Sequence, residues 1–417
     1  MKFLFLTLMV FVPTSSLSVF EPCKTTLSKM SPTPLRHNGT KVQEKYFQLI
    51  DQVAEEFHGK ADFLSPVAWR KKTGTDGLPA LDLPTDVGGK NLPPSDMIKI
   101  FEHAGRHDLN LRDIVGGAHA RVLLLSENPA HKELLKQFAK GNGYMAIAIT
   151  EPEIGSNIRG MKSVAKKVDG GYELTGEKLY NARFDTASHI ILLTQAPGQE
   201  NKPGKLNAFL IPRDYEGLKF TNLETPSLKG NSFGGVSFDK LFIPDSCRIG
   251  KDGDGGKIFR NHFAYWRLMQ TSAAVGTAKR ALEITGKRLK EREAFGKKIG
   301  SMTHLQQALA DHTIELDAQT AYIEKAARLM DQGNYEEAAV LAAGAKAKAV
   351  EAAAKAAEFA VLTHGAAGVS NQFDLFHRYI DIFGLRIADG TSDVMRSEYL
   401  RKIYGNDLWE LTFGPNQ

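Results

Sequence analysis

The spacing of apolar positions divides the chain into three regions. Up to about residue 143, segments such as KYFQLIDQVAEEF and SDMIKIFEHAGR carry apolar residues at three- and four-residue spacing. That period predicts amphipathic helices. A Pro- and Gly-rich stretch, LPALDLPTDVGGKNLPPS, separates the two segments. We therefore expect an N-terminal helical domain over residues 41–143.

The pattern changes over residues 144–250. Short runs rich in β-branched and aromatic residues follow one another, separated by Gly, Pro and Asp turns: YMAIAIT, GYELTGEKLY, HIILLTQA, NAFLIP and GVSFDKLFIP. Such runs are typical of short strands. This region is predicted to form a small central β-barrel or sandwich domain.

The helical period returns over residues 251–417. Two long amphipathic stretches, RLMQTSAAVGTAKRALEITGKRLKERE and LQQALADHTIELDAQTAYIEKAARLMDQG, are followed by an Ala- and Lys-rich segment, EEAAVLAAGAKAKAVEAAAKAAEFAVLTHG. High helix propensity and a regular apolar stripe favour a packed helix over a charged tail. The predicted fold class is therefore α+β: helices, a central β domain, and a C-terminal four-helix bundle.

The first 40 residues are typical of a leader. One lysine precedes an apolar run over residues 3–12 that is too short to span a bilayer, and Ser16-Leu17-Ser18 is an acceptable cleavage site. The following EPCKTTLSKMSPTPLRHNGT is rich in Thr, Ser and Lys, as transit segments are. These features predict entry into the secretory pathway or an organelle. Translation from Met30 is the competing interpretation, and it would leave the protein in the cytoplasm.

Composition excludes some classes of protein. The 417 residues carry a formal net charge of only +5, so nothing demands a nucleic-acid partner. The two cysteines, Cys23 in the leader and Cys247 in a predicted loop, give weak support for a reducing compartment. Neither paired-Cys nor His-rich metal spacing stands out, so we expect no metal. The GxSxG and GxxxxGK motifs do not occur.

Several polar positions fit a cofactor site as well as ordinary structure. Thr150 and Ser156 flank a Gly-bearing turn whose amides and hydroxyls suit a ring edge or a phosphate, although such turns are common. Arg292 ends a predicted helix, where it is either a solvated cation or a bidentate phosphate ligand. Thr391 suits a helix cap and a cofactor contact equally. His364 precedes Gly365, and its imidazole is expected to be structural.

Five motifs in the right order resemble the acyl-CoA dehydrogenase family of flavoproteins. AITEPEIGSN (148–157) resembles the strand and loop around the flavin. EREAFG (291–296) resembles the family's ERxxFG, and LAD (309–311) follows it. THGAAG (363–368) resembles its glycine turn, and DGTSDVMR (389–396) its EGTxxxxR. The resemblance covers residues 80 to about 405 and implies an FAD-dependent oxidoreductase acting on CH–CH groups.

The resemblance implies roles for individual residues. FAD would be held by Ile149, Thr150, Gly155, Ser156, Tyr180, Ala182, Arg292, Phe295, Gln306, His364, Gly365 and Thr391. Substrate would contact Ser156, Arg267 and Gly390. In this family the arginine at the position of Arg292 reaches FAD in a neighbouring subunit, which implies a homodimer or homotetramer.

Asp389 occupies the position of the family's catalytic base. Dehydrogenation next to a thioester needs a base for the α-proton, a polarised carbonyl and an acceptor for the β-hydride. Some family members place the base just before an arginine on the first bundle helix. Trp266 precedes Arg267 there, so that place holds no carboxylate.

Three departures from the family pattern predict a reshaped pocket. Asp389 is one methylene shorter than the usual Glu, and Ala388 replaces a larger Tyr or Leu. The family's W-[IV]-T segment is Tyr180-Asn181-Ala182 here, so the Thr that contacts flavin N5 is missing. Asn181 is a poor substitute, since adjacent strand residues point to opposite faces. Tyr180 can still stack on the flavin ring.

The expected partner is an acyl thioester of CoA or of an acyl-carrier protein. The electron acceptor is either an electron-transfer flavoprotein or oxygen. One alternative is a flavin oxidase of a small acidic substrate, since nitroalkane oxidases resemble this family and carry Asp as the base. The other is a catalytically degenerate FAD-binding or interaction protein, which the missing N5 partner would explain.

Overall fold

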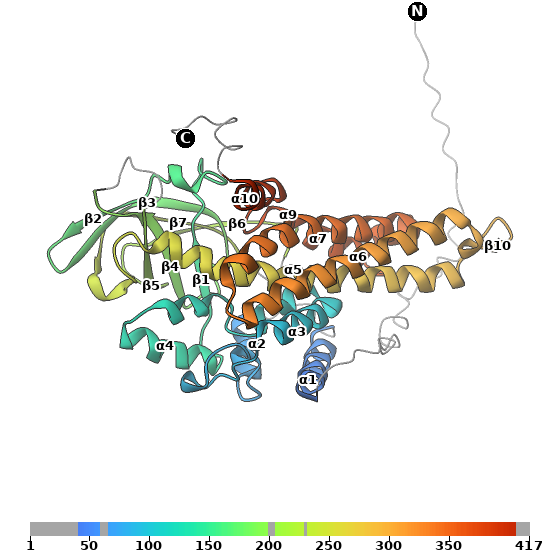
Figure 1. Ribbon diagram of the computed structural model, residues 1–417, viewed down its shortest axis with the longest axis horizontal. Coiled ribbons are helices and arrows are strands. Elements are labelled where there is room, and N and C mark those ends of the chain that lie inside the picture. Colours follow the sequence, from blue (N-terminus) through green and yellow to red (C-terminus); the bar gives the residue numbers. More distant parts are fainter. Residues whose placement is uncertain (1–40, 59–65, 199–204, 229–231, 406–417) are drawn as a thin grey trace, which may run out of the picture. The chain divides into compact units, whose positions relative to one another are not determined.

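A computed structural model describes residues 41–58, 66–198, 205–228 and 232–405. The predicted leader, its cleavage site and Met30 lie outside these residues. From Gly39 onward the chain is a single compact unit. Figure 1 shows its order: helices first, then a sheet, then long helices.

Four α-helices and several short 3₁₀ turns form the N-terminal region. The helices are α1 (Lys41–His58), α2 (Pro66–Thr73), α3 (Pro94–His107) and α4 (Pro129–Ala139). Proline occupies the first turn of α3, where a missing N–H costs nothing. After α3 the chain turns at Asp108, whose carboxylate accepts the amide of Asn110 at 2.7 Å and starts the 3₁₀ segment Leu109–Ile114.

The central region is one eight-stranded sheet. Its strands are β1 (Met145–Ala148), β2 (Val164–Val168), β3 (Gly171–Ala182), β4 (His189–Gln195), β5 (Leu206–Pro212), β6 (Lys219–Leu223), β7 (Phe233–Pro244) and β8 (Arg248–Ile249). The order is β6-β7-β3-β2-β4-β5-β8, with β1 added parallel to β4. Most pairs are antiparallel, and β1–β4 and β2–β4 are parallel.

The sheet curls around its own core. Tyr172 on β3 and Phe209 on β5 pack with ring centroids 5.0 Å apart, although β2 and β4 separate these strands in the sheet. Both rings belong to a buried cluster to which most of the strands contribute. Contact between strands that are not neighbours shows that the sheet is strongly curved, as in a barrel-like domain.

The C-terminal region consists of α5 (Gly255–Glu291), α6 (Thr303–Asp331), α7 (Tyr335–His364), the short α8 (Ala366–Val369), α9 (Leu375–Ile387) and α10 (Ser392–Tyr404). The long helices α5, α6 and α7 run side by side (Figure 1). The β9–β10 hairpin (Glu293–Ala294, Lys297–Lys298) joins α5 to α6 at the end of the bundle opposite the sheet.

Glycines set the crossing between α3 and α5. A Cβ on Gly105 would lie 2.0 Å from the carbonyl oxygen of Ala273, and one on Gly276 would lie 1.9 Å from that of Glu102. Any side chain at either position would push the helices apart. Thr277 uses this close approach to donate its hydroxyl to the carbonyl of Gly105 at 2.7 Å. The crossing fixes α5, which carries much of the site described below.

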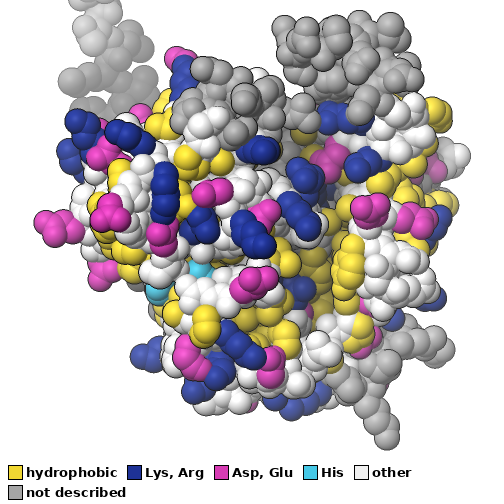
Figure 2. All heavy atoms as spheres, turned by 60° about the vertical axis from the view of Figure 1, so that its left-hand side comes forward, with side chains coloured by type: hydrophobic (Ala, Val, Ile, Leu, Met, Phe, Trp, Pro, Cys, Tyr) yellow, Lys and Arg dark blue, Asp and Glu magenta, His cyan; other side chains and the backbone are white. Residues whose placement is uncertain are grey.

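The predicted fold class is confirmed: helices, a β domain and a helical bundle follow in that order. Among the described residues, no helix has the length and apolar character needed to cross a membrane. On the face shown in Figure 2, Lys and Arg side chains are interspersed with Asp and Glu. This mixture agrees with the small net charge of the chain.

Candidate active site

Asp389 lies on the tight turn between α9 and α10. Its φ is +57°, in the left-handed region that Asp and Asn tolerate better than most residues. Gly390 follows with φ +104°, and a Cβ there would lie 2.6 Å from the terminal methyl of Met395. Thr391 then caps α10, because its hydroxyl accepts the amide of Val394 at 3.3 Å. The sequence Asp-Gly-Thr therefore makes the turn and presents the acid.

Two side chains from α5 hold the Asp389 carboxylate. Trp266 Nε1 donates to Oδ2 at 3.1 Å, and Gln270 Nε2 donates to the same oxygen at 2.8 Å. Trp266 and Gln270 are four residues apart, so they share one face of the helix. Both are buried, with exposed fractions of 1%. Oδ2 accepts both hydrogen bonds, and no described residue donates one to Oδ1.

Two cations hold the backbone of the same turn. Arg267 Nε donates to the carbonyl of Asp389 at 3.0 Å, and its guanidinium also pairs with Glu398 at 3.2 Å. The buried Lys346 donates to the carbonyl of Leu385 at 2.5 Å and to that of Gly390 at 3.3 Å. Burial lowers the pKa of Lys346 to about 8. Arg267, predicted to contact substrate, is thus engaged in positioning the turn that carries Asp389.

A buried polar network adjoins this group. The Arg183 guanidinium pairs with Asp113 and donates to the hydroxyl of Tyr144 and to His119 Nε2, the last at 3.0 Å. Since His119 Nε2 accepts, its Nδ1 carries the hydrogen and donates to His262 Nε2 at 2.9 Å. Burial lowers the pKa of His119 well below its usual range and that of His262 to about 3. Both imidazoles are therefore neutral at physiological pH.

That network contacts the turn that carries Asp389 through Trp266. The indole lies 4.9 Å from the ring of His119 and stacks with that of His262 at 6.5 Å between centroids. The Arg183 guanidinium lies 5.8 Å from the same indole. Trp266 therefore has its polar edge on Asp389 and its faces against two neutral imidazoles and one cation.

The loop after β1 is clamped by a buried ion pair. Glu151 accepts the Lys178 ammonium at 2.8 Å and the amides of Lys162 and Ser163 at 2.6 and 2.9 Å. Lys178 also donates to the carbonyl of Ile149 at 3.3 Å. Burial lowers the pKa of Lys178 to about 8. With its base fixed in this way, the loop presents Gly155 and Ser156 as exposed residues.

The segment Tyr180–Ala182 has side chains on both the buried and the accessible side of β3. Tyr180 has a positive φ of 60° and is 51% exposed, with its ring 6.2 Å from that of Phe233. Asn181 is buried, and its Oδ1 accepts the amide of Ile149 at 3.2 Å. Its Nδ2 has no partner among the described residues. Asn181 thus braces β1, while Tyr180 and the half-buried Ala182 are on the accessible side.

The remaining predicted cofactor residues lie at the far end of the bundle. Arg292 caps α5 at its C-terminus, Phe295 in the following hairpin is 91% exposed, and Gln306 donates to the carbonyl of Gly300 at 2.6 Å. His364 ends α7, where its buried Nδ1 donates to the carbonyl of Ala360 at 2.8 Å. Burial lowers the pKa of His364. Gly365 follows with φ +61°, which suits glycine.

The structure places the predicted residues in three groups, one of which is the loop after β1 together with the end of β3. Asp389, Gly390, Thr391 and Arg267 come together at the turn between α9 and α10. Arg292, Phe295 and Gln306 lie around the β9–β10 hairpin, which Figure 1 shows far from α10 within one chain. Within one chain the hairpin group therefore lies apart from the turn that carries Asp389.

The loop after β1 and the neighbouring end of β3 carry residues that suit FAD binding. The hydroxyls of Thr150 and Ser156 have no hydrogen-bond partner within the described part of the chain, and Ser156 is exposed. Beside this loop, the exposed ring of Tyr180 offers a flat apolar surface for an aromatic cofactor. Free hydroxyls and an open aromatic ring together suit the polar edge and the face of a flavin.

Comparison with known proteins identifies the class as a flavoprotein dehydrogenase. The family model for the acyl-CoA dehydrogenase middle domain matches residues 146–241, and that for the C-terminal domain matches residues 253–404. The chain belongs to the acyl-CoA dehydrogenase family. It is an FAD-dependent oxidoreductase acting on CH–CH groups.

Two relatives illustrate the range of substrates in the family. Benzylmalonyl-CoA dehydrogenase of Aromatoleum aromaticum is 28% identical over 328 residues, covering 77% of this chain and 85% of the relative. L-prolyl-[peptidyl-carrier protein] dehydrogenase of a Serratia strain is 27% identical over 347 residues, covering 82% and 89%. One relative is named for a CoA thioester and the other for a carrier protein.

Solved structures agree with this assignment. The FAD complex of PigA aligns with a TM-score of 0.80 at 25% identity, covering 89% of this chain and all of that one. Butyryl-CoA dehydrogenase from Megasphaera elsdenii aligns with a TM-score of 0.78 at 21% identity, covering 88% and 98%, and shows the shared fold. The predicted family, fold, enzyme class and cofactor are confirmed.

Sequence reasoning missed the residues that hold the acid. Trp266 was noted only because it is not a carboxylate, and Gln270 was not singled out. The clamp between Glu151 and Lys178 and the Arg183 network were also missed. The spacing of Trp266 and Gln270 on one helix was visible, but nothing in the sequence indicated that their shared face meets Asp389.

Proposed function

We propose that this enzyme dehydrogenates an acyl thioester carried by CoA or by a carrier protein, with Asp389 as the base that removes the α-proton. The observation that carries this proposal is the carboxylate itself. Trp266 and Gln270 fix one oxygen, Arg267 and Lys346 fix the backbone on either side, and Oδ1 is left open. A base held in this manner needs little reorganisation when the proton moves.

The proposed reaction removes one proton and one hydride from the acyl chain. Asp389 Oδ1 takes the α-proton, and the electron pair of that C–H bond becomes the new α,β double bond. The bond from the β-carbon to its hydrogen breaks as a hydride leaves, and the product is an α,β-unsaturated thioester. Bound FAD supplies the two-electron acceptor for that hydride.

The protein's other contribution is to orient the acid and exclude water from one side of it. Both donors to Oδ2 are neutral and buried, so they fix the carboxylate without adding a charge beside it. The Trp266 indole covers the acid on the side of α5. The cations Arg267 and Lys346 bind backbone carbonyls and not the carboxylate. The hydrogen bonds to the Asp389 carboxylate therefore come from neutral side chains.

Relatives named for CoA and for carrier-protein substrates support both thioester carriers. The shorter acid at position 389 and the small Ala388 favour a substrate with a shape other than a long, plain acyl chain. We therefore include short branched, aromatic and aminoacyl thioesters in the proposed range.

We also propose that the enzyme works as a homo-oligomer in which Arg292 contacts the FAD of a neighbouring subunit. Support comes from the position of Arg292 at the exposed end of the bundle, away from the catalytic turn (Figure 1). Its planar guanidinium suits bidentate contact with a pyrophosphate.

The test is anaerobic mixing of the FAD-loaded enzyme with a panel of acyl-CoA and acyl-carrier-protein thioesters. A substrate should bleach the flavin's visible absorbance and yield the α,β-unsaturated thioester. Failure of the whole panel, with the flavin bound and reducible by dithionite, would contradict the proposal.

The electron acceptor is settled by the same preparation in air. Hydrogen peroxide formed in proportion to product would indicate an oxidase. Turnover only with an added electron-transfer flavoprotein or dye would indicate a dehydrogenase. Turnover of small nitro compounds without any thioester turnover would favour the nitroalkane-oxidase-like alternative.

A further inference from the structure

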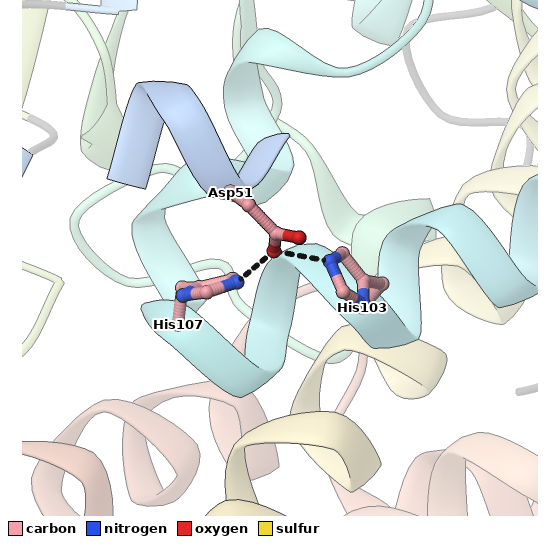
Figure 3. A group of neighbouring side chains, drawn as sticks. All are labelled: Asp51, His103 and His107. Carbon is pink, nitrogen blue, oxygen red and sulfur yellow. Dashed lines mark hydrogen bonds and ion pairs between the residues drawn. The ribbon is translucent and has the colours of Figure 1, made fainter. Parts of the chain in front are cut away.

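Three potential metal ligands meet where α1 packs on α3, away from the catalytic turn. Asp51 comes from α1, and His103 and His107 come from successive turns of α3 (Figure 3). The Nε2 atoms of both imidazoles lie 2.7 Å from the same oxygen, Asp51 Oδ1. All three ligand atoms lie within 4.8 Å of one another.

The two histidines have the helical spacing that lets both rings reach one ion. Residues at i and i+4 lie on the same helix face, and two imidazoles with one carboxylate are a common donor set for Zn²⁺. Tetrahedral Zn²⁺ with bonds of about 2.0–2.2 Å needs its ligand atoms roughly 3.3 Å apart. Each imidazole would have to withdraw from Asp51 by only a few tenths of an ångström, which small side-chain rotations achieve.

Stacking holds the His103 ring in place, and one of its two ring nitrogens makes no hydrogen bond to a described residue. His103 stacks on Phe47, with centroids 4.5 Å apart and planes at 23°. Its buried Nδ1 has no hydrogen-bond partner among the described residues. Without a metal ion both Nε2–H groups donate to Asp51 Oδ1, and an ion binds at Nε2 of His103 once that hydrogen moves to Nδ1, which no described residue occupies. The side chain of Asp51 is 41% exposed, against 13% and 16% for the histidines, so an ion can enter past Asp51.

A second cluster of similar composition lacks these properties. In Asp108, His377 and Asp381, both carboxylates are buried and already accept hydrogen bonds from Asn110 and from the amide of Leu228. Hydrogen bonding to Asp108 raises the pKa of His377 to about 9, so a metal ion would have to displace a firmly held proton there.

We propose that Asp51, His103 and His107 form a site for a divalent transition-metal ion of the Zn²⁺ type that fastens α1 to α3. Three protein ligands leave a fourth position for water. A bound ion would replace the bridging carboxylate contact with three coordinate bonds. Because α3 is packed tightly on α5 through Gly105, the ion would also stabilise the surface on which α5 rests.

The experiment uses the full-length, FAD-loaded protein, stripped of metal with a chelator and then dialysed. Zn²⁺ is titrated by calorimetry into the wild type and into the His107→Gln and Asp51→Asn variants. The wild type should bind with a saturable, one-per-chain step, and each ligand variant should bind roughly 10-fold or more weakly. Excess Zn²⁺ should raise the Tm of the wild type by about 2–4 °C and raise that of the variants by less.

His304→Gln is the matched control, since His304 is exposed on α6 and has no contact that would hold it in the described part of the chain. It should keep the wild-type affinity for Zn²⁺. Bound FAD and circular dichroism verify that each variant is folded. Equal Zn²⁺ affinity in the wild type and in a folded His107→Gln or Asp51→Asn variant would overturn the proposal. So would a wild type that shows no saturable binding.

Discussion

Gln270 is expected to matter for catalysis although it does not touch the transferred proton. Its Nε2 donates the shorter of the two hydrogen bonds to Asp389 Oδ2, 2.8 Å against 3.1 Å for Trp266. Gln270→Leu removes this bond and nearly conserves the side-chain volume. The carboxylate would then be held by Trp266 alone and could rotate away from the α-carbon.

The expected loss follows from the strength of the bond. A hydrogen bond to a charged group contributes about 1.5–3 kcal/mol. A misplacement of about 1 Å in a reacting group can cost ~100-fold in rate. Because the Trp266 bond remains, we expect the rate of flavin reduction to fall by roughly 10- to 100-fold, or about 1.4–2.7 kcal/mol in the activation barrier.

The assay is stopped-flow reduction of the bound flavin by saturating substrate without oxygen. Thr271→Val is the matched control, because Thr271 is the next residue on α5 and its buried hydroxyl has no partner among the described residues. That variant should reduce its flavin at the wild-type rate. If Gln270→Leu, with full FAD content, also stays within about twofold of the wild type, the claim that Gln270 orients the base is refuted.

Three further results are expected. Glu151→Gln leaves the Lys178 ammonium buried without its counter-charge, so thermal or urea unfolding should show a loss of about 3–5 kcal/mol; a loss under 1 kcal/mol would contradict the clamp. Because the pKa of His377 is raised to about 9 in the folded state, its stabilising contribution is complete below about pH 6.5 and is lost as pH rises through 9. The free energy of unfolding should therefore decline over that pH range, and His377→Gln should flatten the decline. An unchanged pH dependence in the variant would show that His377 is not its source. Arg292→Ala should lower FAD retention and weaken the oligomer together in gel filtration, and an intact FAD-loaded oligomer would argue against a contact across subunits.

Local sequence predicted the turn that carries Asp389 well because its conformation depends on neighbouring residues. Asp389 tolerates the positive φ, Gly390 supplies the second one, and Thr391 caps the next helix. The alternation between helical and strand periods likewise predicted the three regions. Each of these depends on propensities that act over a few residues.

The surroundings of the acid could not be predicted in the same way. Trp266 and Gln270 are 123 and 119 positions away from Asp389 in the sequence. Their contact depends on how α5 packs against the turn between α9 and α10, which no local pattern specifies. Glu151 and Lys178 meet for a similar reason, since the pairing of strands in the sheet brings them together.

The cluster of Asp51, His103 and His107 is an intermediate case. The two histidines stand four residues apart in EHAGRHD, but one such pair does not by itself define a metal-binding motif. The third ligand comes from another helix more than 50 positions away, so the sequence showed two ligands at most.

The central claim is that Asp389 takes the α-proton, and Asp389→Asn tests it most directly. Asn keeps the size of the side chain and tolerates the positive φ, but it has no basicity. The measurement is the rate of anaerobic flavin reduction by substrate in this variant, at matched FAD content. We predict a fall of ~100-fold or more, at the upper part of the range for general-base catalysis. Flavin reduction at the wild-type rate would show that another group removes the proton.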